Sequence, residues 1–256
     1  MSLFELNGKV AVITGSSRGI GRAIAERMAE AGASVVVSSR NFQACAEVAT
    51  MIKARGGSAL AHAANISNKA DLRTLVDRTL QEWGRIDVLV VNAAVNPYFG
   101  PLLKIADDAF DKIMASNVRS AVWLCSMVIP AMAERKDGSV IVISSIAGLK
   151  GNSALGAYGI SKAADFQLVR NLAVEYGPSN VRINAIAPAI IRTDFARRLW
   201  EDPEIYDRAV KGYPLRRIGE PDEVAGAAIF LASRAGAFVT GQVIVVDGGM
   251  TIGGGE

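Results

Sequence analysis

Three side chains near the middle of the chain could together carry out acid–base chemistry. Tyr158 and Lys162 stand four residues apart, and Ser145 lies upstream of both. On a helix this spacing brings the phenol and the amine to one face, where an ammonium favours the ionised form of the phenol. A tyrosine in that setting could deliver or accept a proton near neutral pH. Because such a pair also arises by chance, it needs support from the rest of the chain.

Length and composition limit the classes of protein to which the chain could belong. Its 256 residues are 50% hydrophobic and 21% charged, which fits a single large domain over residues 1–256. The formal net charge is +3, but the basic residues are scattered, so we expect no nucleic-acid partner. Residues 1–9 lack the pattern of a signal peptide, and no apolar run of membrane-spanning length is evident. We therefore expect a cytoplasmic protein that does not bind a membrane.

Histidine and cysteine are too rare to build the common metal or nucleophilic sites. His62 is the one histidine, and Cys45 and Cys125 are the two cysteines. A structural zinc site needs about four such ligands, and a Ser-His-Asp triad needs a histidine beside its serine. We expect a structural role for His62, no metal site, and cysteines that stay reduced.

Short apolar runs recur along the chain, with longer segments of helical periodicity between them. Strands that alternate with helices predict βαβ units and a parallel sheet covered on both faces. The expected fold class is therefore α/β, with a doubly wound, seven-stranded parallel sheet. The strands are predicted over residues 10–14, 34–38, 59–63, 88–92, 140–144, 182–186 and 243–246.

Two long segments depart from this regular alternation. Residues 108–135 predict one long helix, in which Pro130 should produce a kink. Residues 189–220 combine many charges with prolines after the sixth predicted strand, as a lid inserted over a substrate site would.

A glycine-rich turn follows the first predicted strand and opens the first predicted helix. Its sequence is Thr14-Gly15-Ser-Ser-Arg18-Gly19-Ile-Gly21. Glycines let the backbone approach a pyrophosphate, and the helix N-terminus supplies free N–H groups and the positive end of a dipole. Such a turn alone is a weak signal, but its place at the start of a βαβ series predicts dinucleotide binding.

The spacing of these motifs resembles the short-chain dehydrogenase/reductase family. A T-G-x-x-x-G-x-G turn precedes the serine and the Y-x-x-x-K pair at family-like intervals, and the likeness runs from Lys9 to Met250. The resemblance implies a single-domain Rossmann fold that binds a nicotinamide cofactor and transfers a hydride. It also implies a catalytic tetrad, whose members in this chain are Asn117, Ser145, Tyr158 and Lys162.

The resemblance gives each member of the tetrad a role. Tyr158 would donate the proton to the substrate oxygen, and Ser145, selected over Ser144 by the family interval, would hydrogen-bond the same oxygen. Lys162 would favour the tyrosinate and bind the nicotinamide ribose. Asn117 would hold a water molecule in a relay that joins Lys162 to solvent.

The end of the second predicted strand bears on the choice of cofactor. A carboxylate there would bind the 2′-hydroxyl of the adenosine ribose and repel a 2′-phosphate. This chain has Ser39-Arg40 instead, and both Arg40 and Arg18 could bind a phosphate. The sequence therefore predicts NADP(H).

Further cofactor contacts follow from the resemblance. Asn65 stands where relatives place Asp near the adenine, and its side-chain oxygen can still accept from the adenine amine. Ala94 replaces a usual Gly, which adds a methyl group near the ribose. The predicted cofactor residues are Gly15, Ser17, Arg18, Gly19, Ile20, Gly21, Ser39, Arg40, Asn65, Ile66, Asn92, Ala93, Ala94, Tyr158, Lys162, Pro188, Ile191 and Thr193.

The substrate pocket is predicted from residues that follow strand ends and from the insertion. They are mainly apolar, which favours a ketone with hydrophobic substituents, and Trp200 could equally be a subunit contact. Residues 96–100 are also similar to a carbonyl-reductase branch of the family. The predicted walls are Asn96, Tyr98, Phe99, Ala147, Leu155, Ala189, Ile190, Leu199 and Trp200.

The predicted activity is NADPH-dependent reduction of a small or medium carbonyl compound, reversible as alcohol oxidation. The alternative is 3-oxoacyl carrier-protein reduction, which the C-terminal half resembles; Lys136 suits an acidic partner, but Val174 stands where a basic residue is common. A remote alternative is a non-enzymatic NADP(H) sensor on the same fold. The family also implies a homotetramer, for which apolar faces over 121–132 and 163–172 give indirect support.

Overall fold

The computed structural model describes residues 2–253, and its seven strands form one parallel sheet. The sheet order is β3-β2-β1-β4-β5-β6-β7, so the direction of winding reverses at β1. The predicted α/β Rossmann fold is confirmed, and each strand boundary lies within two residues of its prediction. The strands are β1 (Val10–Thr14), β2 (Ser34–Ser39), β3 (Ser58–Ala63), β4 (Val88–Val91), β5 (Gly138–Ile143), β6 (Val181–Pro188) and β7 (Val243–Val246).

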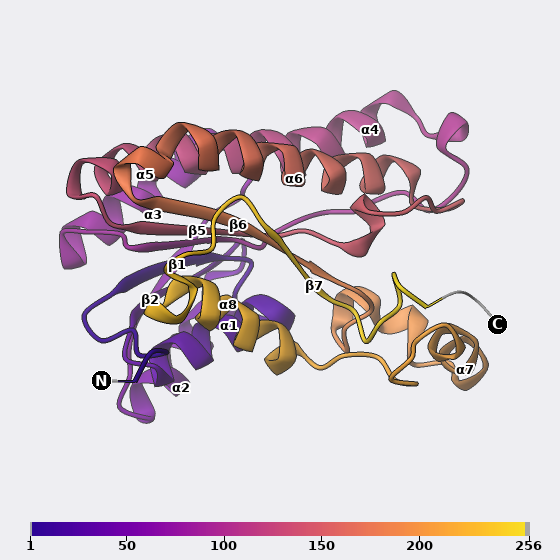
Figure 1. Ribbon diagram of the computed structural model, residues 1–256, viewed down its shortest axis with the longest axis horizontal. Coiled ribbons are helices and arrows are strands. Elements are labelled where there is room, and N and C mark those ends of the chain that lie inside the picture. The colour runs from indigo at the N-terminus through magenta and orange to yellow at the C-terminus, as the bar shows by residue number, and fades with distance from the viewer. Residues whose placement is uncertain (1, 254–256) are drawn as a thin grey trace.

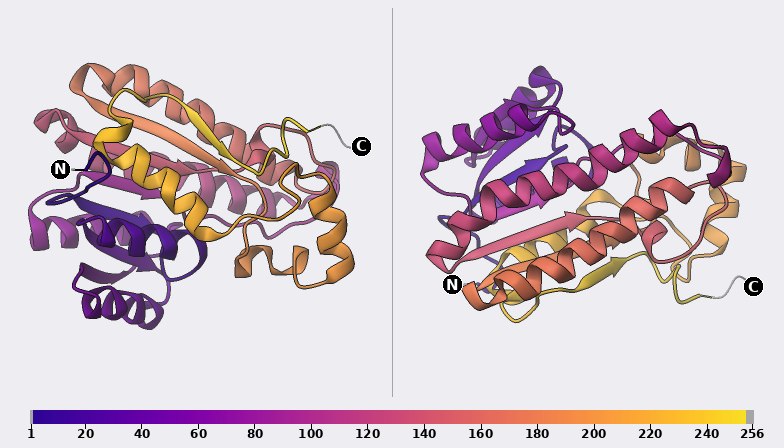
Figure 2. Two further views of the ribbon diagram at one scale, coloured as in Figure 1. Left: turned by 60° about the horizontal axis from the view of Figure 1, so that its bottom comes forward. Right: turned by 90° about the horizontal axis from the view of Figure 1, so that it is seen from above.

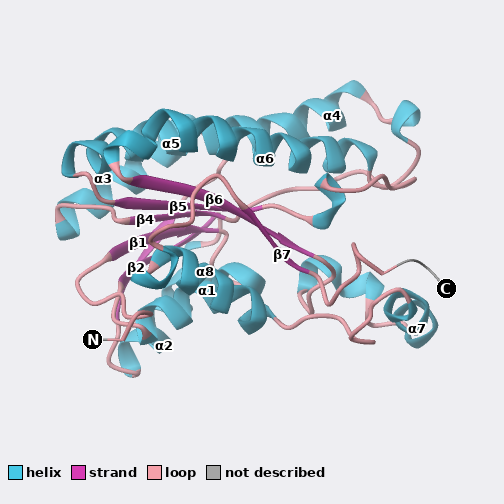
Figure 3. Ribbon diagram, viewed as in Figure 1, coloured by secondary structure: helices cyan, strands magenta, loops and turns pink. Residues whose placement is uncertain are grey.

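Helices cover both faces of this sheet (Figures 1 and 3). One face carries α1, α2 and α8, and the other carries α3, α5 and α6. The helices are α1 (Gly19–Glu30), α2 (Phe42–Ala54), α3 (Lys69–Trp83), α4 (Asp107–Ile113), α5 (Ser120–Arg135), α6 (Gly156–Tyr176), α7 (Pro203–Lys211) and α8 (Pro221–Ala232).

Alternate residues of the central strands are buried on opposite faces. Ala11 and Ile13 of β1 belong to the core under α1 and α8, while Val12 belongs to the core under α3 and α5. Because both faces are covered, such strands read as unbroken apolar runs. The carboxyl ends of β1 and β4 adjoin where the winding reverses, and this is where open α/β sheets bind their ligands.

The long helical run between β4 and β5 differs from its prediction. It consists of α4, a π-helical turn over Met114–Arg119 and α5, rather than one regular helix. π turns are uncommon and often lie at functional sites, and this one contains Asn117. The run lies beside α6 on the same face of the sheet (Figure 2). Pro130 is inside α5, and the kink expected there stays a prediction.

By length and composition alone, the helical run Asp107–Arg135 could cross a membrane, which the sequence did not suggest. Half of its most apolar stretch, 50%, is buried inside the fold. Leu124, Val128 and Met132 of α5 belong to the core beneath it. This burial is typical of a core helix in an α/β domain.

The segment predicted as a lid, 189–220, forms an excursion at the edge where the strands end (Figure 1). It contains a 3₁₀ helix over Asp194–Leu199 and α7. The N–H of Arg192 donates to the oxygen of Gly219 at 2.9 Å, and the N–H of Gly219 donates to the oxygen of Ile190 at 3.0 Å. These two bonds close the neck of the excursion, so it leaves and rejoins the domain at one place.

Candidate active site

The turn after β1 presents main-chain N–H groups at the start of α1. Gly15 and Gly19 have positive φ angles of 67° and 55°, which glycine adopts at low cost. A Cβ at Gly21 would overlap the carbonyl oxygen of Gly15, so the turn folds back this closely only with glycine there. α1 begins without a side-chain cap and without an acidic residue in its first turn. These features fit the pyrophosphate of a dinucleotide.

Asn92 joins the end of β4 to this turn. Its Nδ2 donates to the main-chain oxygens of Thr14 at 2.8 Å and Gly15 at 3.1 Å. In return, Oγ1 of Thr14 accepts from the N–H groups of Asn92 at 3.0 Å and Ala93 at 3.2 Å. The structure therefore brings these predicted cofactor residues together at the point where the winding reverses.

Two predicted phosphate-binding arginines lie at the exposed side of the same turn. Arg18 lies just before α1, and its guanidinium is 4.0 Å from the carboxylate of Asp194 in the lid. Arg40 is exposed directly after β2, whose end pairs with the end of β1. The hydroxyl of Ser39 accepts from the N–H of Asn41 at 3.2 Å, so it stabilises the local loop. Both arginines therefore follow the ends of neighbouring strands, β1 and β2.

Asn65 and Ile66 follow β3, one strand further out. Oδ1 of Asn65 accepts from the N–H of Ser67 at 3.1 Å, and its N–H donates to Asp71 at 3.0 Å. The predicted contact with an adenine amine would therefore use the second lone pair of an oxygen that is already bonded. Ile66 is half-buried against the core.

The remaining predicted cofactor residues lie around the same edge. Ser17 and Ile20 are half-buried in the glycine turn, and Pro188 is the buried last residue of β6. Thr193 lies near the start of the lid, and its Cγ2 is 3.1 Å from where a Cβ of Gly19 would stand. The start of the lid therefore packs directly on the turn.

Tyr158 and Lys162 lie on one side of α6, as their spacing predicts. Nζ of Lys162 is 5.7 Å from the centre of the Tyr158 ring, and Lys162 is only 3% exposed. Nζ donates to the oxygen of Ile143 and to Oδ2 of Asp165, each at 3.0 Å. Burial lowers the pKa of Lys162, but the charges of Asp165 and Tyr158 outweigh it and leave that pKa raised. Lys162 is therefore an ammonium at neutral pH.

The two serines after β5 have different surroundings. The buried Ser144 donates its hydroxyl to the main-chain oxygen of Lys162 at 2.9 Å. The hydroxyl of the half-buried Ser145 accepts from the N–H of Ala147 at 3.1 Å, so its own hydrogen is available to a substrate oxygen. A Cβ at Gly159 would stand 2.8 Å from the oxygen of Ala147. The loop that carries Ser145 therefore packs against the first turn of α6.

Asn117 is buried, and its side chain joins three parts of the site. Its Oδ1 accepts from the N–H of Val95 at 2.8 Å, and its Nδ2 donates to the oxygen of Val95 and to Oγ of Ser161, each at 3.0 Å. Ser161 donates in turn to the main-chain oxygen of Tyr158 at 2.7 Å. Because both Nδ2 hydrogens are used, the expected water would have to bind an oxygen of Asn117. The side chain fixes the loop after β4 relative to α6.

Two aromatic residues of the lid have distinct positions. The Phe195 ring lies 6.4 Å from the Tyr158 ring, centre to centre, and Phe195 is 63% exposed. Trp200 donates its Nε1–H to the oxygen of Thr193 at 3.0 Å, and its ring lies 5.4 Å from the guanidinium of Arg192. Trp200 thus makes its contacts within the lid. The sequence had predicted that it either lines the substrate pocket or contacts another subunit.

The loop after β4 carries two of the predicted substrate residues. Tyr98 donates its hydroxyl to the oxygen of Pro101 at 2.9 Å. Oδ1 of Asn96 is buried and has no hydrogen-bond partner among residues 2–253, so it could accept from a ligand. A bridge pairs Gly100 with Leu155. This loop and the residues before α6 therefore form one wall of the site.

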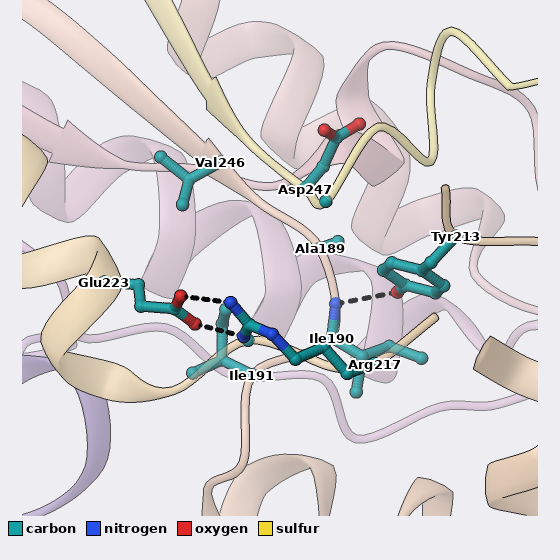
Figure 4. Close-up of a pocket in the computed structure, with 10 residues that line it drawn as sticks. Ala189, Ile190, Ile191, Tyr213, Arg217, Glu223, Val246 and Asp247 are labelled. Carbon is teal, nitrogen blue, oxygen red and sulfur yellow. Dashed lines mark hydrogen bonds and ion pairs between the residues drawn. The ribbon is translucent and has the colours of Figure 1, made fainter. Parts of the chain in front are cut away.

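A small cavity lies between the ends of β6 and β7 and the start of the lid (Figure 4). Its volume is about 60 Å³, and its walls include Ala189, Ile190, Ile191, Tyr213 and Asp247. Tyr213 accepts from the N–H of Ile190 at 3.2 Å. The cavity has room for only a few water molecules. The predicted substrate residues Ala189 and Ile190, and the predicted cofactor residue Ile191, thus line a space too small for a substrate.

The site combines an anion-binding turn, a tyrosine–ammonium pair and a serine hydroxyl at one edge of a doubly wound sheet. Such a set can hold a dinucleotide and move a proton at a substrate oxygen. A family model described as enoyl-(acyl carrier protein) reductase matches residues 15–251. Dehydrogenase/reductase SDR family member 4 from Bos taurus is 41% identical over 244 residues, covering 95% of this chain and 88% of its own. The chain belongs to the short-chain dehydrogenase/reductase family.

Other short-chain dehydrogenases/reductases are similar in sequence and in fold. The Homo sapiens SDR family member 4 is 38% identical over 244 residues, covering 95% of this chain and 88% of its own. A 7α-hydroxysteroid dehydrogenase complexed with NADH and 7-oxo glycochenodeoxycholic acid has a TM-score of 0.93 and 38% identity, covering 99% of this chain and 97% of its own. A gluconate 5-dehydrogenase from Burkholderia cenocepacia, in complex with NADP and tartrate, has a TM-score of 0.93 and 33% identity, covering 98% of both chains. This short-chain dehydrogenase/reductase is thus an oxidoreductase of alcohol and carbonyl groups.

Three residues around the tetrad are not singled out by the sequence motifs of the family. Ser161 links Asn117 to the backbone of α6, Asp165 pairs with Lys162, and the Phe195 ring lies near the Tyr158 ring. The i,i+3 spacing of Lys162 and Asp165 is the one signal that pointed to an ion pair. Phe195 stands in the charged segment after β6, and no motif or spacing in the sequence singled it out.

Proposed function

We propose that this protein is an NADPH-dependent reductase of small or medium ketones that also runs in reverse as an alcohol dehydrogenase. The observation that carries the proposal is the pair of Tyr158 and Lys162, whose ring centre and Nζ are 5.7 Å apart, on a helix whose first turn packs against the loop that carries Ser145. When bound at the turn after β1, the cofactor supplies the hydride that no protein side chain can supply.

Each member of the tetrad has one task in the proposed reduction. Ser145 donates a hydrogen bond to the substrate oxygen and polarises the carbonyl. Tyr158 gives its phenolic proton to that oxygen, and the ammonium of Lys162 stabilises the tyrosinate that remains. Asn117 holds the loop after β4 against α6, which carries both of these residues. In alcohol oxidation the proton moves in the opposite direction.

Two arginines support NADPH over NADH. Arg18 and Arg40 lie at the edge formed by β1 and β2, and no carboxylate stands at the end of β2. A guanidinium binds a phosphate through paired N–H groups. Among similar structures, the gluconate 5-dehydrogenase is in complex with NADP and the 7α-hydroxysteroid dehydrogenase with NADH. Because relatives use both cofactors, the proposed preference rests on the arginines.

The surroundings of the tyrosine support an apolar ketone rather than an acyl carrier protein. Phe195 lies against Tyr158, and Phe99 in the loop after β4 is 65% exposed. An acidic carrier protein would need basic residues around the entrance. Lys136 lies just before β5 and the 81% exposed Val174 lies in the last turn of α6, so within one subunit both are at the opposite end of the sheet from Ser145 and Tyr158. Faster turnover of an acetoacetyl thioester than of simple ketones would reverse this order.

We also propose a homotetramer in the cytoplasm. Val122 of α5 and Ile160 of α6 are exposed apolar residues on neighbouring helices, and Phe238 and Val245 are exposed before and within β7. Apolar surface of this kind is typical of subunit contacts. Both cysteines are free and buried, as expected in a reducing compartment. Light scattering that reports a monomer would contradict the assembly.

A substrate panel with both cofactors tests the proposed function. Purified protein is mixed with NADPH or NADH and a series of ketones and quinones, and oxidation of the cofactor is followed by absorbance. We expect turnover of apolar ketones with a higher kcat/KM for NADPH than for NADH. Tight NADPH binding with no turnover across the panel would instead favour a sensor.

A further inference from the structure

A buried carboxylate that the proposed mechanism does not use lies beside Lys162. Asp165 is one turn further along α6 and is 1% exposed, and its Oδ2 is 3.0 Å from Nζ of Lys162. Its Oδ1 is buried and has no hydrogen-bond partner within the described part of the chain. A carboxylate is costly to bury unless it is paired. Burial raises the pKa of Asp165, and the charge of Lys162 and its hydrogen bond counteract this rise, so the ion pair is what favours the charged form.

The bonds of Lys162 show what the carboxylate does in the site. An ammonium has three N–H bonds, and two of these are directed to Ile143 of β5 and to Asp165. One N–H bond remains for the open side of the site, where Tyr158 lies and where the cofactor ribose would bind. Asp165 thus fixes the position of Nζ between α6 and β5.

Few other titratable groups face Lys162 within the described residues. On α6 they are Asp165 and Tyr158, and β5 contributes only the main-chain oxygen of Ile143. On α5 the buried thiol of Cys125 faces Asp165; burial and that charge raise the pKa of Cys125 to about 12, so it is neutral. Burial by itself lowers the pKa of Lys162, and the charge of Asp165 counteracts this.

We propose that Asp165 is a positioning residue of this active site, whose carboxylate fixes Nζ of Lys162 against β5 and keeps Lys162 charged. The catalytic consequence rests on the proposed function, whereas the ion pair itself does not. In alcohol oxidation the tyrosinate is the base, and Lys162 stabilises a tyrosinate only as an ammonium. Asp165 therefore preserves activity at alkaline pH, where an equally buried lysine without a partner would lose its proton.

Thermal unfolding at neutral pH tests the ion pair without any activity measurement. The proteins compared are wild type, Asp165→Asn, Lys162→Met and the double variant. Asp165→Asn leaves a buried ammonium unpaired, so we expect its Tm to fall by about 5 °C or more. The double variant contains neither charge and should be more stable than Asp165→Asn alone, or should fold where that variant does not. If the Tm change of the double variant equals the sum of the changes in Asp165→Asn and Lys162→Met, the proposal is overturned.

The pH profile of alcohol oxidation tests the catalytic consequence. At alkaline pH the activity of wild type eventually falls. We expect this alkaline limb of the profile to lie about one pH unit or more lower in Asp165→Asn than in wild type. Asp165→Glu should move the limb back towards its wild-type pH. Ser139→Ala is the control, because it removes a buried bond to Leu231 at 2.9 Å from the far end of β5 and should leave the profile unchanged. An alkaline limb of Asp165→Asn that coincides with wild type would overturn the proposal. If wild type turns over no alcohol, the proposed function fails, and the unfolding comparison still decides the ion pair.

Discussion

Nζ of Lys162 lies 5.7 Å from the centre of the Tyr158 ring. One side of α6 thus carries both the proposed proton donor and the ammonium that would stabilise its conjugate base. The helix is held in place by loops from two different strands, through Asn117 bonded to Ser161 and through the close packing of Gly159 on the loop after β5. The geometry of the site therefore depends on the sheet edge at which these loops meet.

Replacement of Arg40 by alanine should weaken the preference for NADPH. A lost charge-assisted hydrogen bond costs about 1.5–3 kcal/mol, so kcat/KM for NADPH should fall about 10- to 100-fold. The value for NADH should change much less, because NADH has no 2′-phosphate. Steady-state kinetics with both cofactors measure the effect. Arg78→Ala removes an arginine whose exposed ion pair with Glu82 lies on α3 and is the control; equal losses with both cofactors would refute the assignment of Arg40.

The two serines after β5 should respond differently to alanine. Ser145→Ala removes the donor to the substrate oxygen, and we expect kcat to fall about 10²- to 10³-fold with little change in Tm. Ser144→Ala removes a buried bond to Lys162, and should cost about 1 kcal/mol of stability with a smaller loss of kcat. Kinetics and thermal unfolding of both variants separate the roles. A larger loss of kcat in Ser144→Ala would show that the wrong serine was chosen.

A methyl group at Gly21 should disrupt the cofactor turn. The Cβ would overlap the oxygen of Gly15 and crowd Nδ2 of Asn92, so Gly21→Ala should weaken NADPH binding at least about tenfold. Fluorescence titration with NADPH measures this. Gly226→Ala in α8 is the matched control, since its Cβ meets nothing within 4 Å, and it should stabilise the helix by up to about 1 kcal/mol. Unchanged affinity in Gly21→Ala would exclude this turn as the cofactor site.

Glu223 should make the neck of the lid sensitive to acid. Hydrogen bonds from Arg217 and from the N–H of Glu220 lower its pKa from 4.5 to about 2. The folded-state pKa is depressed, so this contribution to stability is complete above about pH 4.5 and is lost as the pH falls towards 2. The side chain is 40% exposed, so solvent screening keeps the effect to a Tm change of about 2–4 °C.

Thermal unfolding of Glu223→Gln against pH measures this contribution. The Tm difference from wild type should be largest near neutral pH and should vanish at about pH 2. Glu82→Gln, which has only an exposed ion pair with Arg78, provides the control. A Tm difference that stays constant over this pH range would contradict the pKa of Glu223.

The strands could be predicted from the sequence because burial on both faces favours apolar residues at nearly every position. Both faces of β1, β4 and β5 are covered, so every residue in them is buried and the runs are mainly apolar. The π turn at Met114–Arg119 has no comparable pattern of residues, because it changes the hydrogen bonds of a helix without changing its apolar positions. One regular helix was therefore expected where the structure has a break at Asn117.

The proximity of Tyr158 and Lys162 could be predicted because their spacing is local, whereas the contacts of the proposed catalytic residues with other elements depend on packing. Tyr158 and Lys162 are four residues apart on one helix, so the sequence alone places them together. The bond between Asn117 and Ser161 joins two helices, and no spacing in the sequence encodes it. The burial of Asp165 is likewise set by α5 and β5, and a charge at this spacing would ordinarily be read as an exposed pair.

The chemistry assigned to Tyr158 is tested most directly by NADPH oxidation in a Tyr158→Phe variant. Phenylalanine keeps the ring that packs near Phe195 but has no proton to give. We expect kcat for ketone reduction to fall by about 10²- to 10⁴-fold while the Kd for NADPH stays within about twofold of wild type. Tyr176→Phe, at the other end of α6, should retain wild-type activity. Turnover by Tyr158→Phe at the wild-type rate would contradict the proposed role of Tyr158 as the acid.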